Sequence, residues 1–207
     1  MTGPGSFFAS RALRALEIGA WPLLLLVACS FEATPPGAER MGTYSFRALP
    51  TSRTCELDDV VANEFTFIAT FSRDPDTADA YVTLKQYSRD AGWNGQTIES
   101  VTAATRSFGG GCAGCPMALE ETLRVDLLSQ SQSVASGNTC PDGPPPTAND
   151  DAGIRAPGPD KFGYDAVRAC GVLSTSTRVT GPSPDGGLCP VVCSQCTLGY
   201  RLTGERQ

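Results

Sequence analysis

The clearest strand in this sequence reads Phe65-Thr66-Phe67-Ile68-Ala69-Thr70-Phe71. Phenylalanine or alanine occupies every second position, and two of the three residues between them are threonines. A period of two places alternate side chains on opposite faces of a β-strand. We therefore expect one face of this strand to lie in the core and the threonine face to meet water. The residues expected in the core are Phe65, Phe67, Ala69 and Phe71.

The same period recurs along the rest of the chain. It predicts strands at residues 44–48, 80–87, 96–108, 119–128, 162–180 and 197–202. The stretch 162–180 reads as one or two strands, with a break near Gly171. The stretch 119–128 also fits a helix, but its polar residues alternate with Leu123, Val125 and Leu127, which favours a strand.

Turn signals separate these strands. Residues 73–77 and 182–187 are rich in Pro, Asp and Gly, and the pair Asn94-Gly95 is a strong signal for a β-hairpin. Consecutive strands joined by tight turns predict an all-β antiparallel meander of about 7–8 strands, which hides its edges by closing into an up-and-down barrel or by folding into a sandwich.

The N-terminal residues carry an export signal. Arg11 and Arg14 precede an apolar run from 18 to 28, which is typical of a signal peptide and shorter than the roughly 20 residues of a membrane span. The run ends in Leu26-Val27-Ala28-Cys29, which resembles the lipobox of bacterial lipoproteins. The resemblance implies that the signal is cut before Cys29, whose thiol then carries diacylglycerol and whose freed amine is acylated. An ordinary secretory signal, cut at another small residue, would instead leave Cys29 incidental.

The resemblance also implies a location. An Asp after the lipidated Cys retains many lipoproteins in the inner membrane. Here this position is Ser30, so the retention signal is missing. We therefore expect a lipid-anchored outer-membrane protein, on the periplasmic face or the cell surface. The opening Gly42-x-Tyr44-x-Phe46 and the Cys-rich C-terminal part are similar to uncharacterised Cys-rich lipoproteins of myxobacteria, which bring no known function.

The domain organisation follows from these signals. We expect a signal peptide at 1–28, a lipidated tether at 29–41 with the flexible sequence Pro35-Pro36-Gly37, and one disulfide-stapled all-β domain at 42–207. Residues 140–161 are nearly all Pro, Gly, Asp, Asn and Ala, which predicts a long, mobile, Pro/Gly-rich loop within that domain.

Eight cysteines follow Cys29. An even number in an exported chain predicts four disulfides, and eight cysteines permit 105 pairings. We expect Cys140 to pair with Cys170, because the two flank the long loop and closing a long loop constrains the unfolded chain most. The cysteines expected in disulfides are Cys55, Cys112, Cys115, Cys140, Cys170, Cys189, Cys193 and Cys196.

Two Cys-x-x-Cys pairs allow other chemistry. Cys112 and Cys115 have the spacing of a thiol–disulfide oxidoreductase, and with Cys193 and Cys196 they could hold zinc. Structural disulfides are favoured over both, because an exported chain meets oxidising conditions and the other cysteines also need partners.

Composition excludes several functions. The chain has no histidine, which excludes a Ser-His-Asp or Cys-His nucleophile, c-type haem attachment and His-ligated zinc. Its formal net charge of −6 becomes −7 when Arg11, Arg14 and Glu17 leave with the signal peptide, so nucleic acid is not an expected partner.

Asp74, Asp76 and Asp79 lack the Gly and Glu of an EF-hand loop and are expected in a hairpin turn. We expect no metal and no cofactor.

These observations predict a function class and no specific ligand. We expect a membrane-anchored cell-envelope lipoprotein that acts as a binding or structural module and is not an enzyme. Its expected partners are the membrane, through the N-terminal lipid, and a small apolar ligand or an envelope protein. The alternative is an envelope thiol–disulfide oxidoreductase that uses Cys112 and Cys115.

The lipobox generates a direct test. Replacing Cys29 by Ala should block processing at this site, because lipidation needs the cysteine thiol. Metabolic labelling with a fatty acid and mass spectrometry of the membrane fraction measure the outcome. A Cys29→Ala protein that reaches the same mature mass and stays in the membrane would overturn the lipoprotein interpretation.

Overall fold

The computed structural model describes residues 37–54, 63–85, 87–107, 112, 114–161, 163–182, 186–189, 193 and 195–207. All of them belong to one compact unit, Glu32–Gln207. The predicted signal peptide, the lipidation site Cys29, the tether as far as residue 36 and the predicted disulfide cysteine Cys55 lie outside the described residues.

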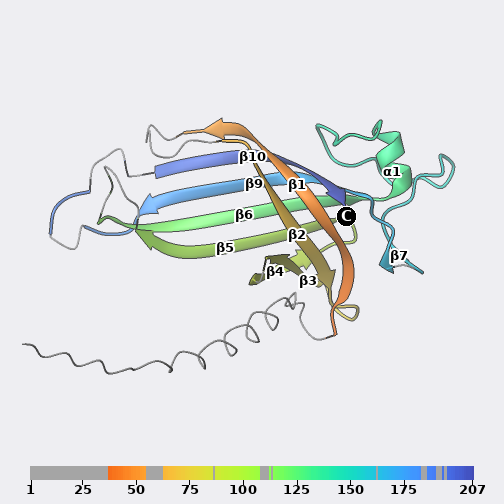
Figure 1. Ribbon diagram of the computed structural model, residues 1–207, viewed down its shortest axis with the longest axis horizontal. Coiled ribbons are helices and arrows are strands. Elements are labelled where there is room, and N and C mark those ends of the chain that lie inside the picture. Colours follow the sequence, from red (N-terminus) through yellow and green to blue (C-terminus); the bar gives the residue numbers. More distant parts are fainter. Residues whose placement is uncertain are drawn as a thin grey trace, which may run out of the picture. The chain divides into compact units, whose positions relative to one another are not determined.

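Eight antiparallel strands close into a barrel, and each strand pairs with the next one along the chain (Figure 1). The strands are β1 (Glu39–Arg53), β2 (Phe65–Arg73), β3 (Asp79–Leu84), β4 (Tyr87–Trp93), β5 (Thr97–Ser107), β6 (Pro116–Leu128), β9 (Arg168–Val179) and β10 (Gln195–Arg206). Pairing of β1 with β10 closes the barrel. The predicted antiparallel meander is confirmed, and of the two predicted architectures it adopts the barrel. β1 begins at Glu39, so the predicted tether overlaps it at residues 39–41.

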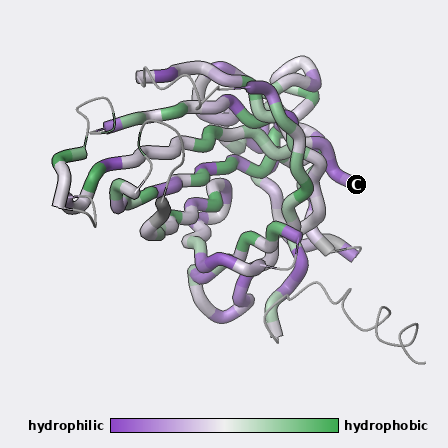
Figure 2. Tube along the Cα trace, turned by 60° about the vertical axis from the view of Figure 1, so that its left-hand side comes forward, coloured by the Kyte–Doolittle hydropathy of each residue, from purple (hydrophilic) through white to green (hydrophobic). Residues whose placement is uncertain are grey.

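The period-two pattern places the expected face of β2 inside the barrel. Ala69 and Phe71 are fully buried, while Phe67 is half-buried and Phe65 is 38% exposed. On the opposite face Thr66 is exposed as expected, but Thr70 is buried and its hydroxyl lies 2.8 Å from that of Thr43. The alternation of hydrophobic and hydrophilic residues continues along the long strands (Figure 2).

Two strand predictions are wrong in detail. The predicted strand 80–87 is divided, because β3 ends at Leu84 and Lys85 adopts a left-handed φ of 56° that turns the chain into β4. The predicted break near Gly171 does not occur, and β9 continues through it. A Cβ atom at Gly171 would lie 2.0 Å from the carbonyl oxygen of Arg124, so the glycine allows β6 to approach β9 closely.

The chain between β6 and β9 forms α1 (Gln130–Ala135), β7 (Pro159–Asp160) and β8 (Gly163–Tyr164). The sequence did not predict α1, although its capping box, in which Ser129 and Gln132 bond each other's backbone, has a recognisable pattern. Gln132 Nε2 also donates to the carbonyl of Pro146 at 2.8 Å, and Ser129 Oγ donates to that of Arg155 at 2.6 Å. These bonds attach the loop 140–161 to α1, and its mobility stays a prediction.

Tyr164 and Ala166 close one end of the barrel. The hydroxyl of Tyr44 donates to the carbonyl of Ala166 at 3.0 Å from inside the barrel, and burial raises the pKa of Tyr44, which keeps the phenol protonated as a donor. Trp93 packs edge-on against Tyr164, with ring centroids 6.1 Å apart, and the Arg73 guanidinium lies 5.7 Å from the centroid of the same ring. We call this the closed end.

The buried face of β2 provides a stability test. Phe71→Ala should lower the free energy of unfolding by about 3–5 kcal/mol, because it removes a fully buried ring and leaves a cavity. Thr66→Ala, on the exposed face, should change stability by less than about 1 kcal/mol. Urea unfolding of both variants measures the difference, and equal losses would contradict the assignment of faces.

Candidate functional site

At the end of the barrel opposite the closed end, the described strands leave part of the wall incomplete because they differ in length. β3 and β4 span six and seven residues, and the β4–β5 ladder has two residue pairs, Gly92↔Glu99 and Trp93↔Ile98. The β5–β6 ladder extends to Ser107↔Pro116, and the β6–β9 ladder to Met117↔Val179. The long strands therefore project beyond the short ones (Figure 1).

A cavity of about 800 Å³ lies at this end on both sides of β2, and we call it the mouth pocket. Ser45, Thr66, Ile68, Thr70 and Thr83 line its part on the outer face, and inward-facing side chains line its part inside the barrel. Part of its wall is formed by inward-facing apolar side chains from four strands, since the period of two continues beyond the filled core. These side chains are Phe65, Phe67, Leu84, Leu123 and Leu173. The volume lies within the range of small-molecule sites, roughly 300–1,000 Å³. An eight-stranded barrel is wide enough either to be filled by side chains or to hold one small ligand.

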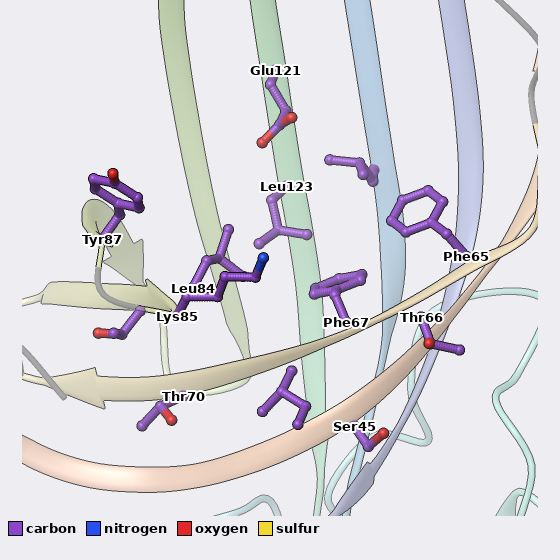
Figure 3. A pocket seen from close by; sticks show the side chains of 13 residues that line it. Ser45, Phe65, Thr66, Phe67, Thr70, Leu84, Lys85, Tyr87, Glu121 and Leu123 are labelled. Carbon is purple, nitrogen blue, oxygen red and sulfur yellow. The ribbon is translucent and has the colours of Figure 1, made fainter. Parts of the chain in front are cut away.

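Aromatic side chains border the mouth pocket. Tyr87 lies on one side and Phe65 on the other, with Phe67 and Leu123 between them (Figure 3). Tyr87 is 68% exposed and Phe65 is 38% exposed, both high values for rings of this size. Phe67 is held from below by the ring of Phe46, stacked on it at a centroid distance of 5.0 Å.

One ion pair lies at the mouth. Arg89 of β4 donates to the carboxylate of Glu121 on β6, and both side chains are about three-quarters buried. Glu121 precedes Leu123 by two residues and therefore faces the same way, into the barrel. The pair links β4 to β6 across the gap where the β4–β5 ladder is short. The sequence signal for this ion pair is Glu121, a charged residue on the apolar face of the predicted strand 119–128.

Lys85 is the second cation at the mouth. It occupies the tip of the β3–β4 turn, and its ammonium is directed toward the space between Leu123 and Phe67 (Figure 3). Among the residues that the structure describes, Lys85 has no ion-pair partner. The sequence analysis missed Lys85, because a lysine gives no turn signal of its own.

The far ends of the long strands are joined by disulfides. Cys112 bonds Cys193, with Cα atoms 5.8 Å apart, and Cys115 bonds Cys189, with Cα atoms 5.9 Å apart. Together with Met117 these cysteines form a second buried cluster. The bridges link Cys112 and Cys115, which precede β6, to Cys193 and Cys189, which precede β10.

The other predicted cysteine roles can be placed as follows. The predicted Cys140–Cys170 disulfide is confirmed, with Cα atoms 5.4 Å apart, and Cys196 is also disulfide-bonded. The bridges leave Cys112, Cys115 and Cys193 without the free thiolates that zinc requires. A Cys-x-x-Cys oxidoreductase would use a disulfide between Cys112 and Cys115. In this structure each of these two cysteines bonds another partner instead.

The remaining candidates form no site in the described part of the chain. Asp74 accepts a hydrogen bond from the backbone of Asp76 at 2.8 Å, and Asp79 donates its backbone N–H to Thr77 at 3.1 Å, so these aspartates serve the β2–β3 turn. The described residues contain no cluster of three or more Cys, Asp or Glu able to hold a metal ion. They also contain no helix with the length and apolarity needed to cross a membrane.

The mouth pocket is thus the candidate site, on the basis of its geometry. No protein-family model matches the chain, and a search of curated proteins finds no significant match.

The disulfide arrangement can be tested chemically. A non-reducing peptide map should link Cys112 to Cys193 and Cys115 to Cys189. The native protein should resist alkylation after mild reduction, because Cys112, Cys115 and Cys193 are buried. A map that joins Cys112 to Cys115, with rapid reversible reduction, would instead favour the oxidoreductase alternative.

Proposed function

We propose that this chain is a lipid-anchored binding protein of the bacterial cell envelope that holds a small, largely apolar molecule in the mouth pocket. The observation that carries the proposal is the pocket itself. It combines about 800 Å³ of space with apolar walls and partly exposed aromatic rings at the end of an otherwise filled barrel.

The binding energy would come mainly from burial. Each Å² of apolar surface removed from water contributes about 25 cal/mol. The rings of Phe65 and Phe67 and the side chain of Leu123 offer such surface to a ligand, and their positions are set by strand pairing. Because strand pairing fixes the wall before a ligand binds, ordering the protein side chains on binding costs little free energy.

The exported location rests on separate support. The lipobox Leu26-Val27-Ala28-Cys29 and the residue Ser30 favour an outer-membrane lipoprotein. All seven cysteines that the structure describes are disulfide-bonded, which fits an oxidising compartment. Two or more acyl chains give stable anchoring, so no membrane-spanning segment is needed.

The route of the chain suits such an anchor. β1 begins at Glu39, which pairs with Arg73 in the ladder and bonds its guanidinium at 2.9 Å, close to the closed end. A tether that precedes Glu39 therefore joins the barrel at the end away from the mouth pocket.

A neutral fluorescent probe tests the proposal. Nile red should bind the mature protein with an increase in fluorescence, and Phe65→Asp should weaken binding at least about tenfold, because it places a charge in the apolar wall. Val172→Asp is the matched control, since Val172 is a half-exposed apolar residue on β9 that does not line the mouth pocket.

Fluorescence titration and circular dichroism of both variants give the result. Absence of Nile red binding, or equal weakening by the two folded variants, would contradict binding in the mouth pocket.

A further inference from the structure

We infer that the mouth pocket selects amphipathic molecules with one negatively charged head group, and that Lys85 is the residue that contacts this group. The inference rests on the proposed function and specifies its ligand class. It starts from the charges at the mouth and from the direction of the Lys85 side chain.

The charges at the mouth do not cancel. The pocket lining contains one carboxylate, Glu121, and one ammonium, Lys85. Glu121 is already neutralised by Arg89, whose guanidinium bonds it. Lys85 has no ion-pair partner among the described residues, so the described part of the pocket lining carries one positive charge that no carboxylate pairs with. This charge stands out in a chain whose formal net charge is −6.

The backbone places this charge at the edge of the apolar wall. Leu84 pairs with Tyr87 in the β3–β4 ladder, and Lys85 follows Leu84 with a φ of 56°. The aliphatic part of the side chain runs beside Leu84 and its ammonium is directed toward the pocket (Figure 3). A lysine commonly lays its methylene stem on apolar surface and keeps its ammonium at the wet edge.

The apolar wall and the Lys85 ammonium together discriminate between ligands. An apolar tail inside the pocket brings a head group to the rim, where the lysine ammonium offers three hydrogen-bond donors to an anionic oxygen. A neutral head group would gain only an ordinary hydrogen bond, and a cationic one would be repelled. Single-chain carboxylic acids have this chemistry.

Three ligands with the same tail separate these cases. Isothermal titration of the mature protein at pH 7 with dodecanoate, dodecan-1-ol and dodecylammonium, all kept below micelle formation, compares the head groups directly. Dodecanoate should bind about fivefold more tightly than dodecan-1-ol, which is the scale of one solvent-exposed charge contact. Dodecylammonium should bind more weakly than either.

Variants assign the preference to Lys85. Lys85→Gln should remove the preference for dodecanoate, because it should weaken dodecanoate binding more than dodecan-1-ol binding. Lys85→Asn, whose short side chain tolerates a left-handed backbone, provides a second variant if the first folds poorly. Lys161→Gln removes the same charge from the β7–β8 turn, away from the pocket lining, and should leave both affinities unchanged.

The outcomes distinguish the two proposals. If none of the three ligands binds, the proposed function fails. If dodecan-1-ol binds as tightly as dodecanoate, or if a folded Lys85 variant keeps the full preference, binding in the mouth stands and the inference about Lys85 is overturned.

Discussion

The ring of Phe46 packs at the point where the barrel closes, and the rest of the structure is arranged around it. It stacks on Phe67 at 5.0 Å and meets Phe71 edge-on at 5.9 Å, which joins β1 to β2. On the other side it lies over Gly204 of β10, where an added Cβ would come within 2.6 Å of the ring. Since β1 pairs with both β2 and β10, this packing holds both sides of the seam. A larger residue at position 204 would compete with the ring for the same space.

The stack on Phe67 also marks the boundary between the filled core and the open mouth. Toward the closed end, Tyr44 and Phe71 are fully buried. The hydrogen bond from Tyr44 to Ala166 joins the barrel wall to the residues that close this end. Toward the mouth, the apolar period of β2 continues to Phe65, but β3 and β4 are too short to cover it. Phe65 packs edge-on against Tyr200 of β10, but the short strands β3 and β4 leave space beside it that a ligand can fill. Strand length thus converts a core pattern into a pocket.

Charges and disulfides stabilise the regions where apolar packing is thin. Arg89 and Glu121 connect β4 to β6 across the short ladder, and because both side chains are largely buried the loss of either partner is costly. The bridges Cys112–Cys193 and Cys115–Cys189 tie together the ends of the projecting strands. A disulfide constrains the unfolded chain most when it closes a long loop, and these two join cysteines 81 and 74 residues apart. The wall of the mouth pocket is therefore held at both its inner and outer ends.

Local patterns in the sequence determined the existence of the strands predicted at 65–71 and 119–128, the Asn94-Gly95 turn, the barrel or sandwich alternatives and the Cys140–Cys170 pair. Periodicity, turn chemistry and loop flanks involve residues close in the chain. Tertiary structure decided the choice of a barrel, the turn at Lys85, the unbroken β9 at Gly171 and the partners of Cys112 and Cys115. It also decided the site: Lys85, Arg89 and Glu121 meet Phe65 and Phe67 only because strands of unequal length close on one another. Such a meeting depends on register and on closure between distant segments, which a period of two along one strand does not specify.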